Sequence, residues 1–466
     1  MKKTEAPGYA ELVRQVVRTT PTLLTSEEIT QRVAALRPIE TRSPSATIRG
    51  VITLCRLIAR GGEAGYGWYP RMINGARVRV TLFAEEFDRQ FVGLDDLARD
   101  LLCPSFFADQ SLKQREPITL TLPTGERFHP TLVLQHVGQG DWGTEGTPEF
   151  WRWLTQHQPQ SGDSLILTCV DGEAREYRVE YEATAASAEA ALRARTWAVK
   201  QAAREHLWRN RAHATAPWDL AQHLLASGQY HHAVPPAPYN QIWNHVDGER
   251  MMFEAAAETP SRKTATARQA YQLHVQLQNI HPPIWRRIVV TDTTTLAQLH
   301  WIIQLAMSWT NSHLHQFTIE GVHYSDPSFE LDEDFDDWKD ANALTLSKLT
   351  KRAGLQFSYE YDFGDSWRHD IMVEAITPIL KGEALLRCLA GERACPPEDC
   401  GGIGGYERLK TELRDLTHPE RNSWLLWLGG GFDVESFDVA GADWLLSKLV
   451  SVFAQKPPTQ KKGWYR

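Results

Sequence analysis

The chain has 466 residues, of which 42% are apolar and 23% charged. This ordinary globular composition excludes the disordered, fibrous and coiled-coil classes, and at roughly 150 residues per domain it predicts about three domains. The net charge of -8 excludes a uniformly basic nucleic-acid coat but leaves room for a local basic face. No apolar run approaches the ~20 residues of a membrane span, so we expect no membrane contact. Six scattered cysteines favour a reducing, cytoplasmic setting.

The first 93 residues predict three helices followed by a turn and a strand, the order of elements in a winged helix. Thr25–Glu28 reads as a capping box at the start of the second helix. Apolar spacing predicts the third helix over residues 45–58. A glycine-rich turn follows at 61–69, and residues 77–82 alternate as a strand.

This segment is also locally basic. Between Arg37 and Phe83, eight arginines and two glutamates give a net charge of +6. Some of these arginines recur at spacings of seven and four, which predicts that several share one side of the third helix, and the others extend toward the wing. We expect DNA contacts from a set of seven: Arg42, Arg49, Arg56, Arg60, Arg71, Arg77 and Arg79. The alternative is a solvated face of a domain that contacts proteins.

Residues 94–185 predict a β-rich, barrel-like domain. A short aromatic helix at 150–154 precedes a strand at 165–170, and Asp171-Gly172 signals a hairpin. This order is similar to the small DNA-binding pseudobarrels of plant B-three-type factors. Residues 186–253 predict a helical extension, and 254–269 a polar linker.

Residues 270–455 predict alternating strands and an apolar helix capped at Thr294 or Thr295. Four blocks of this region resemble the plasmid pRiA ORF-three-like family: IHPPIWRRIVV (280–290), LHWIIQLAMSWTNSHLHQF (299–317), YEYDFGDSWRHDIMVE (359–374) and CLAGERACPPEDCGGIGGY (388–406). The resemblance implies a compact α+β domain with a mixed or antiparallel sheet and no established reaction. It also implies a bacterial or archaeal protein linked to plasmids and insertion elements. The whole chain is thus expected to be an α+β multidomain protein.

One set of side chains in this region predicts chemistry. His313 and His315 would point the same way on a strand, and Asp362 and Asp365 flank a glycine turn with His369 close behind. Imidazoles and carboxylates together suit a divalent transition metal such as Zn, Mn or Fe. In the alternative interpretation the aspartates bind turn amides and the histidines pack among tryptophans.

A second candidate metal site consists of Cys388, Cys395 and Cys400. Their spacing is wider than that of most structural zinc sites, and a fourth ligand would have to be His369, His418 or Asp399. Buried structural thiols are the alternative. The glycine run 401–405 before a helix expected near Tyr406 could bind an anion or form a plain loop, and the acidic segment 330–337 predicts a solvated loop.

The leading interpretation is a nucleic-acid-binding or regulatory protein linked to mobile elements. One alternative is a metal-dependent hydrolase or nuclease that uses the His/Asp set, and another is a protein-interaction scaffold. The sequence identifies no protein partner and no substrate.

Overall fold

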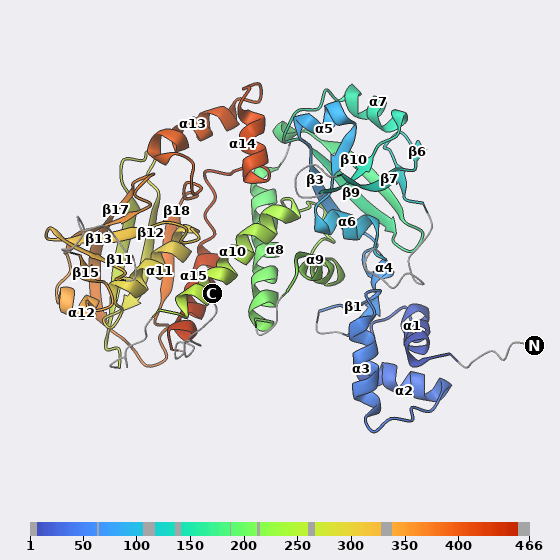
Figure 1. Ribbon diagram of the computed structural model, residues 1–466, viewed down its shortest axis with the longest axis horizontal. Helices are drawn as coiled ribbons and strands as arrows, with labels where there is room; N and C mark the ends of the chain where they lie inside the picture. Colours follow the sequence, from blue (N-terminus) through green and yellow to red (C-terminus); the bar gives the residue numbers. More distant parts are fainter. Residues whose placement is uncertain are drawn as a thin grey trace, which may run out of the picture. The chain divides into compact units, whose positions relative to one another are not determined.

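The computed structural model describes residues 7–62, 65–105, 117–135, 141–186, 188–211, 215–259, 266–327 and 338–454. The chain divides into two compact units, each described here by itself (Figure 1). Unit 1 comprises Met1–Asn244 and Pro419–Gly431. Unit 2 comprises His245–His418 and Phe432–Arg466. Both combine helices with sheets, which confirms the α+β, multidomain class.

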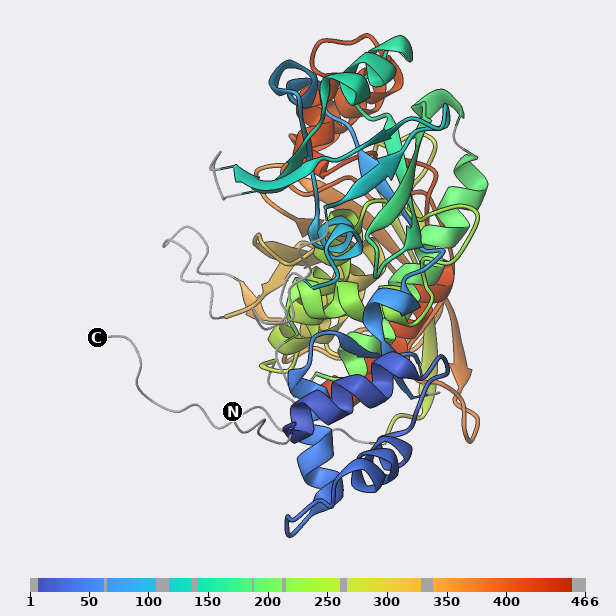
Figure 2. The same ribbon diagram turned by 90° about the vertical axis from the view of Figure 1, so that its right-hand side faces the viewer.

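Unit 1 begins with three helices and a hairpin that share one apolar core (Figures 1 and 2). The elements are α1 (Tyr9–Thr19), α2 (Ser26–Leu36), α3 (Pro44–Leu54), β1 (Ile58–Arg60) and β2 (Tyr66–Trp68). The predicted capping box is present, since the Thr25 side chain accepts from the Glu28 amide and the Glu28 side chain accepts from the Thr25 amide. The third helix is shorter than predicted, because the chain turns at Cys55 and Ile58 opens β1.

The strand predicted at 77–82 is present as β3 (Arg77–Thr81), but it does not extend that hairpin. It pairs antiparallel with β9 (Ser164–Asp171), with Val80 opposite Leu165. Its three central residues are all buried, so β3 has no solvent face of the kind that a wing strand presents. The strand prediction is therefore confirmed, whereas its assignment to the winged-helix segment is wrong.

The middle of unit 1 holds two sheets. A five-stranded sheet has the order β3-β9-β10-β5-β6, and a three-stranded sheet has the order β4-β8-β7. Their remaining strands are β4 (Phe91–Gly93), β5 (Thr119–Thr121), β6 (Arg127–Phe128), β7 (Thr131–Gln135), β8 (Asp141–Glu145) and β10 (Glu176–Glu182). The hairpin signal at Asp171-Gly172 joins β9 to β10 as predicted. Among the described strands the two sheets stay open and separate, so they close no barrel.

Helices make up the rest of unit 1. Four short ones accompany the sheets: α4 (Tyr69–Met72), α5 (Ala84–Arg89), α6 (Asp96–Leu102) and the aromatic α7 (Pro148–Gln156). A 3-10 turn, η2 (Thr184–Ala186), leads toward the helical stretch. The longer helices are α8 (Glu189–Arg209) and α9 (Pro217–Ala226), and α14 (Arg421–Leu428) comes from the late segment. Helix α10 (Tyr239–Ala256) starts in unit 1 and continues into unit 2, which begins at His245. The expected linker overlaps the end of α10, and part of it lies outside the described residues.

Unit 2 is built on an eight-stranded sheet with the order β15-β14-β13-β16-β17-β11-β12-β18. The strands are β11 (Gln269–Leu277), β12 (Trp285–Thr291), β13 (His315–Ile319), β14 (Val322–Ser325), β15 (Lys339–Asp340), β16 (Gln356–Tyr361), β17 (Trp367–Pro378) and β18 (Arg387–Glu392). All pairs are antiparallel except β14 with β15, so the mixed sheet implied by the family resemblance is confirmed.

Besides the larger part of α10, unit 2 has four helices among the described residues: α11 (Leu296–Met307), α12 (Leu346–Leu349), α13 (Gly402–Arg414) and α15 (Val439–Phe453). α11 starts at the second of the two predicted caps, Thr295, which forms a capping box with Gln298. α15 packs along β18 and against α11 (Figure 1). No helix in the described part of the chain is both long enough and apolar enough to cross a bilayer.

Candidate metal centre

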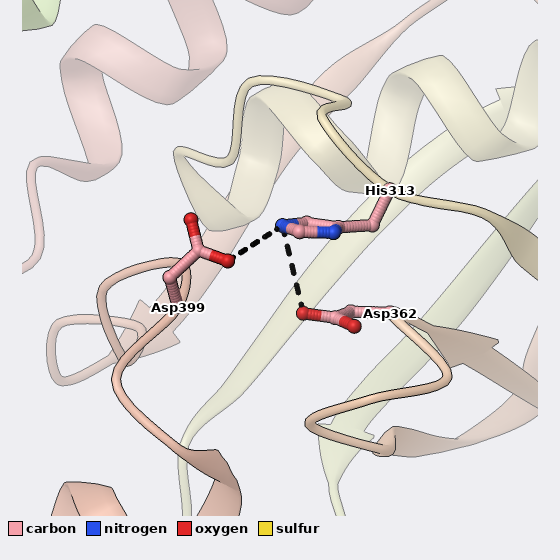
Figure 3. Close-up of side chains that lie close together, drawn as sticks. All are labelled: His313, Asp362 and Asp399. Carbon is pink, nitrogen blue, oxygen red and sulfur yellow. Dashed lines mark ion pairs between the residues drawn. The ribbon is translucent and has the colours of Figure 1, made fainter.

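Three side chains from separate segments of unit 2 converge at one point (Figure 3). His313 lies in the loop between α11 and β13, Asp362 follows the end of β16, and Asp399 lies in the loop before α13. His313 Nε2 is 3.1 Å from Asp399 Oδ1 and 3.6 Å from Asp362 Oδ2. One ligand atom from each residue lies within 4.8 Å of the others, which is close enough for a single ion to bind all three.

The register of β13 against β16 explains why His313 meets Asp362. In this antiparallel pair His315 lies opposite Tyr361. The Asp362 amide donates to the Leu314 carbonyl at 2.9 Å, so the backbone pairing continues for one more residue past the start of β13 and the end of β16. His313, the next residue, is therefore held above the turn that starts at Asp362.

The Asp362 turn leaves one carboxylate oxygen free to face the histidine. Asp362 has a left-handed backbone, with φ of 59°, and is buried. Its Oδ1 accepts from the amides of Gly364 and Asp365, at 2.9 and 3.2 Å. Since these turn amides engage Oδ1, the side chain has a fixed orientation in which Oδ2 points toward His313.

Tyr361 and Glu398, which directly precede Asp362 and Asp399, form hydrogen bonds with the loop that carries His313. The Tyr361 hydroxyl donates to Glu398 Oε1 and accepts from the Ser312 amide, the latter at 2.9 Å. Glu398 also accepts from the Thr310 amide at 3.2 Å. Burial first, and then the bond to Glu398, raise the pKa of Tyr361, so its hydroxyl remains a donor. Tyr361 and Glu398 thus connect the three segments that carry His313, Asp362 and Asp399.

The donor set fits a divalent transition metal. Although two carboxylate oxygens are near, His313 Nε2 has no hydrogen-bond partner among the described residues. Asp399 is 66% exposed and His313 26%, so the group is open to water on one side. One imidazole and two carboxylates suit Zn, Mn or Fe, and three protein ligands leave coordination positions for water or substrate.

The other predicted catalytic candidates lie elsewhere. His313 precedes β13, so the strand alternation expected to align it with His315 does not apply. His315 is buried and stacks on His300, with ring centroids 3.5 Å apart, and burial lowers its pKa to about 3. Asp365 Oδ2 accepts from the Gly401 amide at 3.2 Å. His369 is fully buried beside the Tyr359 carbonyl, and burial lowers its pKa to about 3. The structure therefore joins His313 and Asp362 but not the other three.

The three cysteines do not form a cluster of possible metal ligands in the described part of the chain. Cys388, Cys395 and Cys400 are buried free thiols, and none belongs to a group of three or more possible ligands. Burial raises the pKa of Cys388 to about 11 and that of Cys400 to about 12, so both side chains are protonated thiols in the metal-free protein. The zinc interpretation therefore stays a prediction, and the burial of the three thiols is also what the alternative of structural cysteines expects.

Asp399 is a member of the candidate centre that the sequence pattern indicates only as a possible fourth ligand beside the cysteines. It follows Glu398 and has a left-handed backbone, with φ of 60°. The glycine run begins α13 earlier than expected, at Gly402 rather than near Tyr406, and Gly401 caps the helix with φ of 90°. The acidic segment 330–337 lies outside the described residues.

The predicted basic face is largely neutralised. Arg77 pairs with Glu180 at 2.8 Å, and Arg79, itself buried, pairs with Glu182 at 2.6 Å. These pairs form because β3 joins the sheet that contains β10. Four of the seven candidate arginines are bound to carboxylates in this way, the pairs being Arg56–Asp219, Arg71–Glu173, Arg77–Glu180 and Arg79–Glu182.

The remaining three arginines are exposed, with no hydrogen bond or ion pair of their side chains to other described residues: Arg42, Arg49 and Arg60. Only Arg49 lies on α3, because the helix spans Pro44–Leu54. The expectation that several candidate arginines share one side of this helix is therefore wrong.

Comparisons with known proteins concern the same part of the chain as the candidate metal centre. The family model of the plasmid pRiA4b ORF-3-like protein matches residues 269–441. An uncharacterized protein, y4hQ, from Sinorhizobium fredii (strain NBRC 101917 / NGR234) is 36% identical over 188 residues, which are 40% of this chain and 92% of that protein. The crystal structure of MM3350 from Methanosarcina mazei Go1, a protein of unknown function, matches with 34% identity and a TM-score of 0.34, covering 38% of this chain and 98% of that one. The chain therefore belongs, through residues 269–441, to the plasmid pRiA4b ORF-3-like family.

Proposed function

We propose that the family domain binds a divalent transition metal ion through His313, Asp362 and Asp399 and uses it for hydrolysis. The observation that carries the proposal is the approach of one imidazole nitrogen and two carboxylate oxygens to within 4.8 Å, with no hydrogen bond at the imidazole nitrogen. A bound metal of this kind lowers the pKa of its water ligand and polarises a substrate oxygen. The protein itself supplies the orientation, through the Asp362 turn and through Tyr361 and Glu398.

The test is metal binding by the full-length protein. Titration with Zn²⁺, Mn²⁺ and Co²⁺ should show one site, and Asp399→Asn should weaken it by at least tenfold because a charged ligand is lost. Asp370→Asn is the matched control, since Asp370 is an exposed aspartate on β17 that is not one of the three ligands. A wild-type protein that binds none of the three ions, or an Asp399→Asn protein that binds as tightly as the wild type, would contradict the proposal.

Hydrolysis requires a separate assay. The metal-loaded protein should cleave at least one chromogenic ester among p-nitrophenyl phosphate, bis-p-nitrophenyl phosphate and p-nitrophenyl acetate. The activity should be lost on chelation and in Asp399→Asn. Stoichiometric metal without any turnover would reduce the proposal to a structural metal site.

We also propose a second candidate function, nucleic-acid binding by a winged-helix-like module at the start of unit 1, with a regulatory role linked to mobile elements. It is supported by three exposed arginines without carboxylate partners around α3 and the β1–β2 hairpin: Arg42, Arg49 and Arg60. Three phosphate contacts would give a slope of about -2.7 in a plot of log K against log salt concentration.

Fluorescence anisotropy with a labelled 20-base-pair duplex tests this second candidate. The triple variant with alanine at all three positions should lose most of the affinity and of the salt dependence. Arg77→Ala is the control, because Glu180 already neutralises that arginine. Binding that is absent in the wild type, or unchanged in the triple variant, would favour the interaction scaffold instead.

A further inference from the structure

A buried network of hydrogen bonds lies beneath the loop that carries His313. His300 and Gln304 are one turn apart on α11, and Tyr359 reaches them from β16. The three side chains are at most 2% exposed. Buried polar groups of this kind hold a fixed geometry only if their donors and acceptors are matched.

The hydrogen-bond partners show which atom donates and which accepts in each bond of this network. Gln304 Nε2 donates to the Tyr359 hydroxyl at 3.0 Å, so the hydroxyl directs its own hydrogen to His300 Nδ1, 2.8 Å away. Nδ1 is then an acceptor, and the neutral imidazole carries its hydrogen on Nε2. This Nε2 donates to Asn311 Oδ1 at 2.8 Å. Burial lowers the pKa of His300 well below its usual value, and the nearby His315 lowers it further. Both effects favour the neutral ring.

Asn311 connects this network to the metal centre, because it lies two residues before His313. Its backbone is left-handed, with φ of 57°, and it is held at two points. The Asn311 amide donates to Gln304 Oε1 at 3.0 Å, while its side chain accepts from His300. The Trp309 amide donates to the Gln304 carbonyl at 3.0 Å, so the first part of the loop is also attached to α11.

We propose that His300 is a positioning residue for the metal centre: through the Nε2–Asn311 bond it fixes the loop that places His313 opposite Asp362 and Asp399. His300 does not touch the ligand atoms itself. The expected effect of His300 on metal binding rests on the proposed function. The expected effect of His300 on the loop can be measured without metal.

Two substitutions of His300 separate the bond to Asn311 from the packing of the ring. His300→Gln places an amide donor near the position of Nε2 and keeps the bond to Asn311. His300→Asn reaches only the position of Nδ1, so it loses that bond. Both variants lose the stack on His315, and this loss is therefore matched between them.

The first measurement is amide hydrogen exchange of residues 311–313 in the metal-free, full-length protein. We expect exchange to be about fivefold faster or more in His300→Asn, as follows from the loss of one buried bond, and close to wild type in His300→Gln. Equal exchange in His300→Asn and the wild type would overturn the inference. If neither variant folds, Asn311→Gly tests the same bond from its other end, since glycine accommodates the positive φ.

The second measurement is the visible d–d spectrum of bound Co²⁺, which reports ligand geometry rather than stability. His300→Asn should change the band positions and weaken Co²⁺ binding about tenfold, and His300→Gln should restore both. Unchanged bands in His300→Asn would contradict the positioning role. A wild-type protein without d–d bands would refute the proposed metal centre, while the exchange experiment would still decide whether His300 positions the loop.

Discussion

Tyr361 has an unusual position among the residues around the candidate ligands, because its one hydroxyl binds two loops. It accepts from the Ser312 amide and donates to Glu398, so it contacts the His313 loop and the Asp399 loop together. Asp362 is its direct neighbour in the chain. This oxygen atom is therefore one of the contacts that set the distance between the three candidate ligands, beside the Thr310–Glu398 bond and the pairing of the Asp362 amide with Leu314.

Removing this oxygen gives a sharp prediction at the scale of one residue. Tyr361→Phe should weaken Co²⁺ or Zn²⁺ binding by about tenfold to a hundredfold, the usual effect of losing an outer-shell partner. The free energy of unfolding should fall by about 1 kcal/mol, since the part-buried Ser312 amide loses its acceptor while Glu398 keeps its bond to Thr310. Isothermal titration and urea unfolding measure the two effects.

Tyr324→Phe is the matched control for this prediction. Tyr324 lies on β14, where its ring is 6.0 Å from the Lys339 ammonium, and its hydroxyl has no hydrogen bond to the three candidate ligands among the described contacts. It should bind metal like the wild type. Normal metal affinity in Tyr361→Phe would show that the ligand geometry is set by the backbone pairing of β13 and β16 instead.

At the scale of elements, the start of α13 and the Asp362 turn are in close contact. Gly402 is the first residue of α13 and has a φ of 65°. A Cβ atom at this position would lie 2.8 Å from the Asp365 carbonyl oxygen, which is backbone and cannot move aside easily. The glycine therefore allows the helix to begin directly against the turn that orients Asp362.

Gly402→Ala should consequently destabilise the protein by about 1–3 kcal/mol and weaken metal binding, because both the positive φ and the close contact are lost. Gly404 provides a control within the same helix, since a Cβ there would meet nothing within 4 Å. Gly404→Ala should stabilise by about 0.5–1 kcal/mol and leave metal affinity unchanged. Urea unfolding measures the stability of both variants, and Co²⁺ titration measures their metal affinity. Equal effects of the two substitutions would show that the close contact at Gly402 has no special role.

Elements were predictable where the signal is local. The capping box at Thr25, the helix cap at Thr294 or Thr295 and the alternation of β11 each depend on a few neighbouring residues, and each is confirmed. The end of α3 was not predictable from apolar spacing, because buried apolar residues follow directly after the helix, at Cys55, Leu57 and Ile58. The arginine spacing therefore predicted a shared face on a helix over residues 45–58, whereas α3 stops at Leu54.

The candidate site was only partly predictable for a related reason. Asp362 belongs to a turn whose hydrogen bonds are local, and His313 was identified by residue type. Asp399 is far from both in sequence, and its approach depends on the contacts of the neighbouring Glu398 with Tyr361 and Thr310. The charge pairs that neutralise Arg77 and Arg79 depend in the same way on the order of strands in a sheet. Such long-range pairings have no local signature in a single sequence.

At the scale of the whole molecule, a buried neutral histidine makes stability depend on pH. His369 is fully buried, and its Nε2 has no hydrogen-bond partner in the part of the chain that the structure describes. Burial lowers its pKa to about 3, against an ordinary value near 6.5 in the unfolded chain. Between these two values the unfolded state binds a proton that the folded state does not, so the free energy of unfolding falls as the pH falls.

The contribution of His369 should be absent above about pH 6.5, grow by up to about 1.4 kcal/mol for each pH unit below it, and level off near pH 3. Urea unfolding of the metal-free protein at pH 7 and pH 5 should show a smaller loss of stability in His369→Gln than in the wild type, by about 2 kcal/mol. His232→Gln, at an exposed histidine, is the control and should retain the wild-type loss. An equal loss in His369→Gln and the wild type would mean that other groups govern the acid response, because glutamine cannot take up the proton that this prediction assigns to the buried ring.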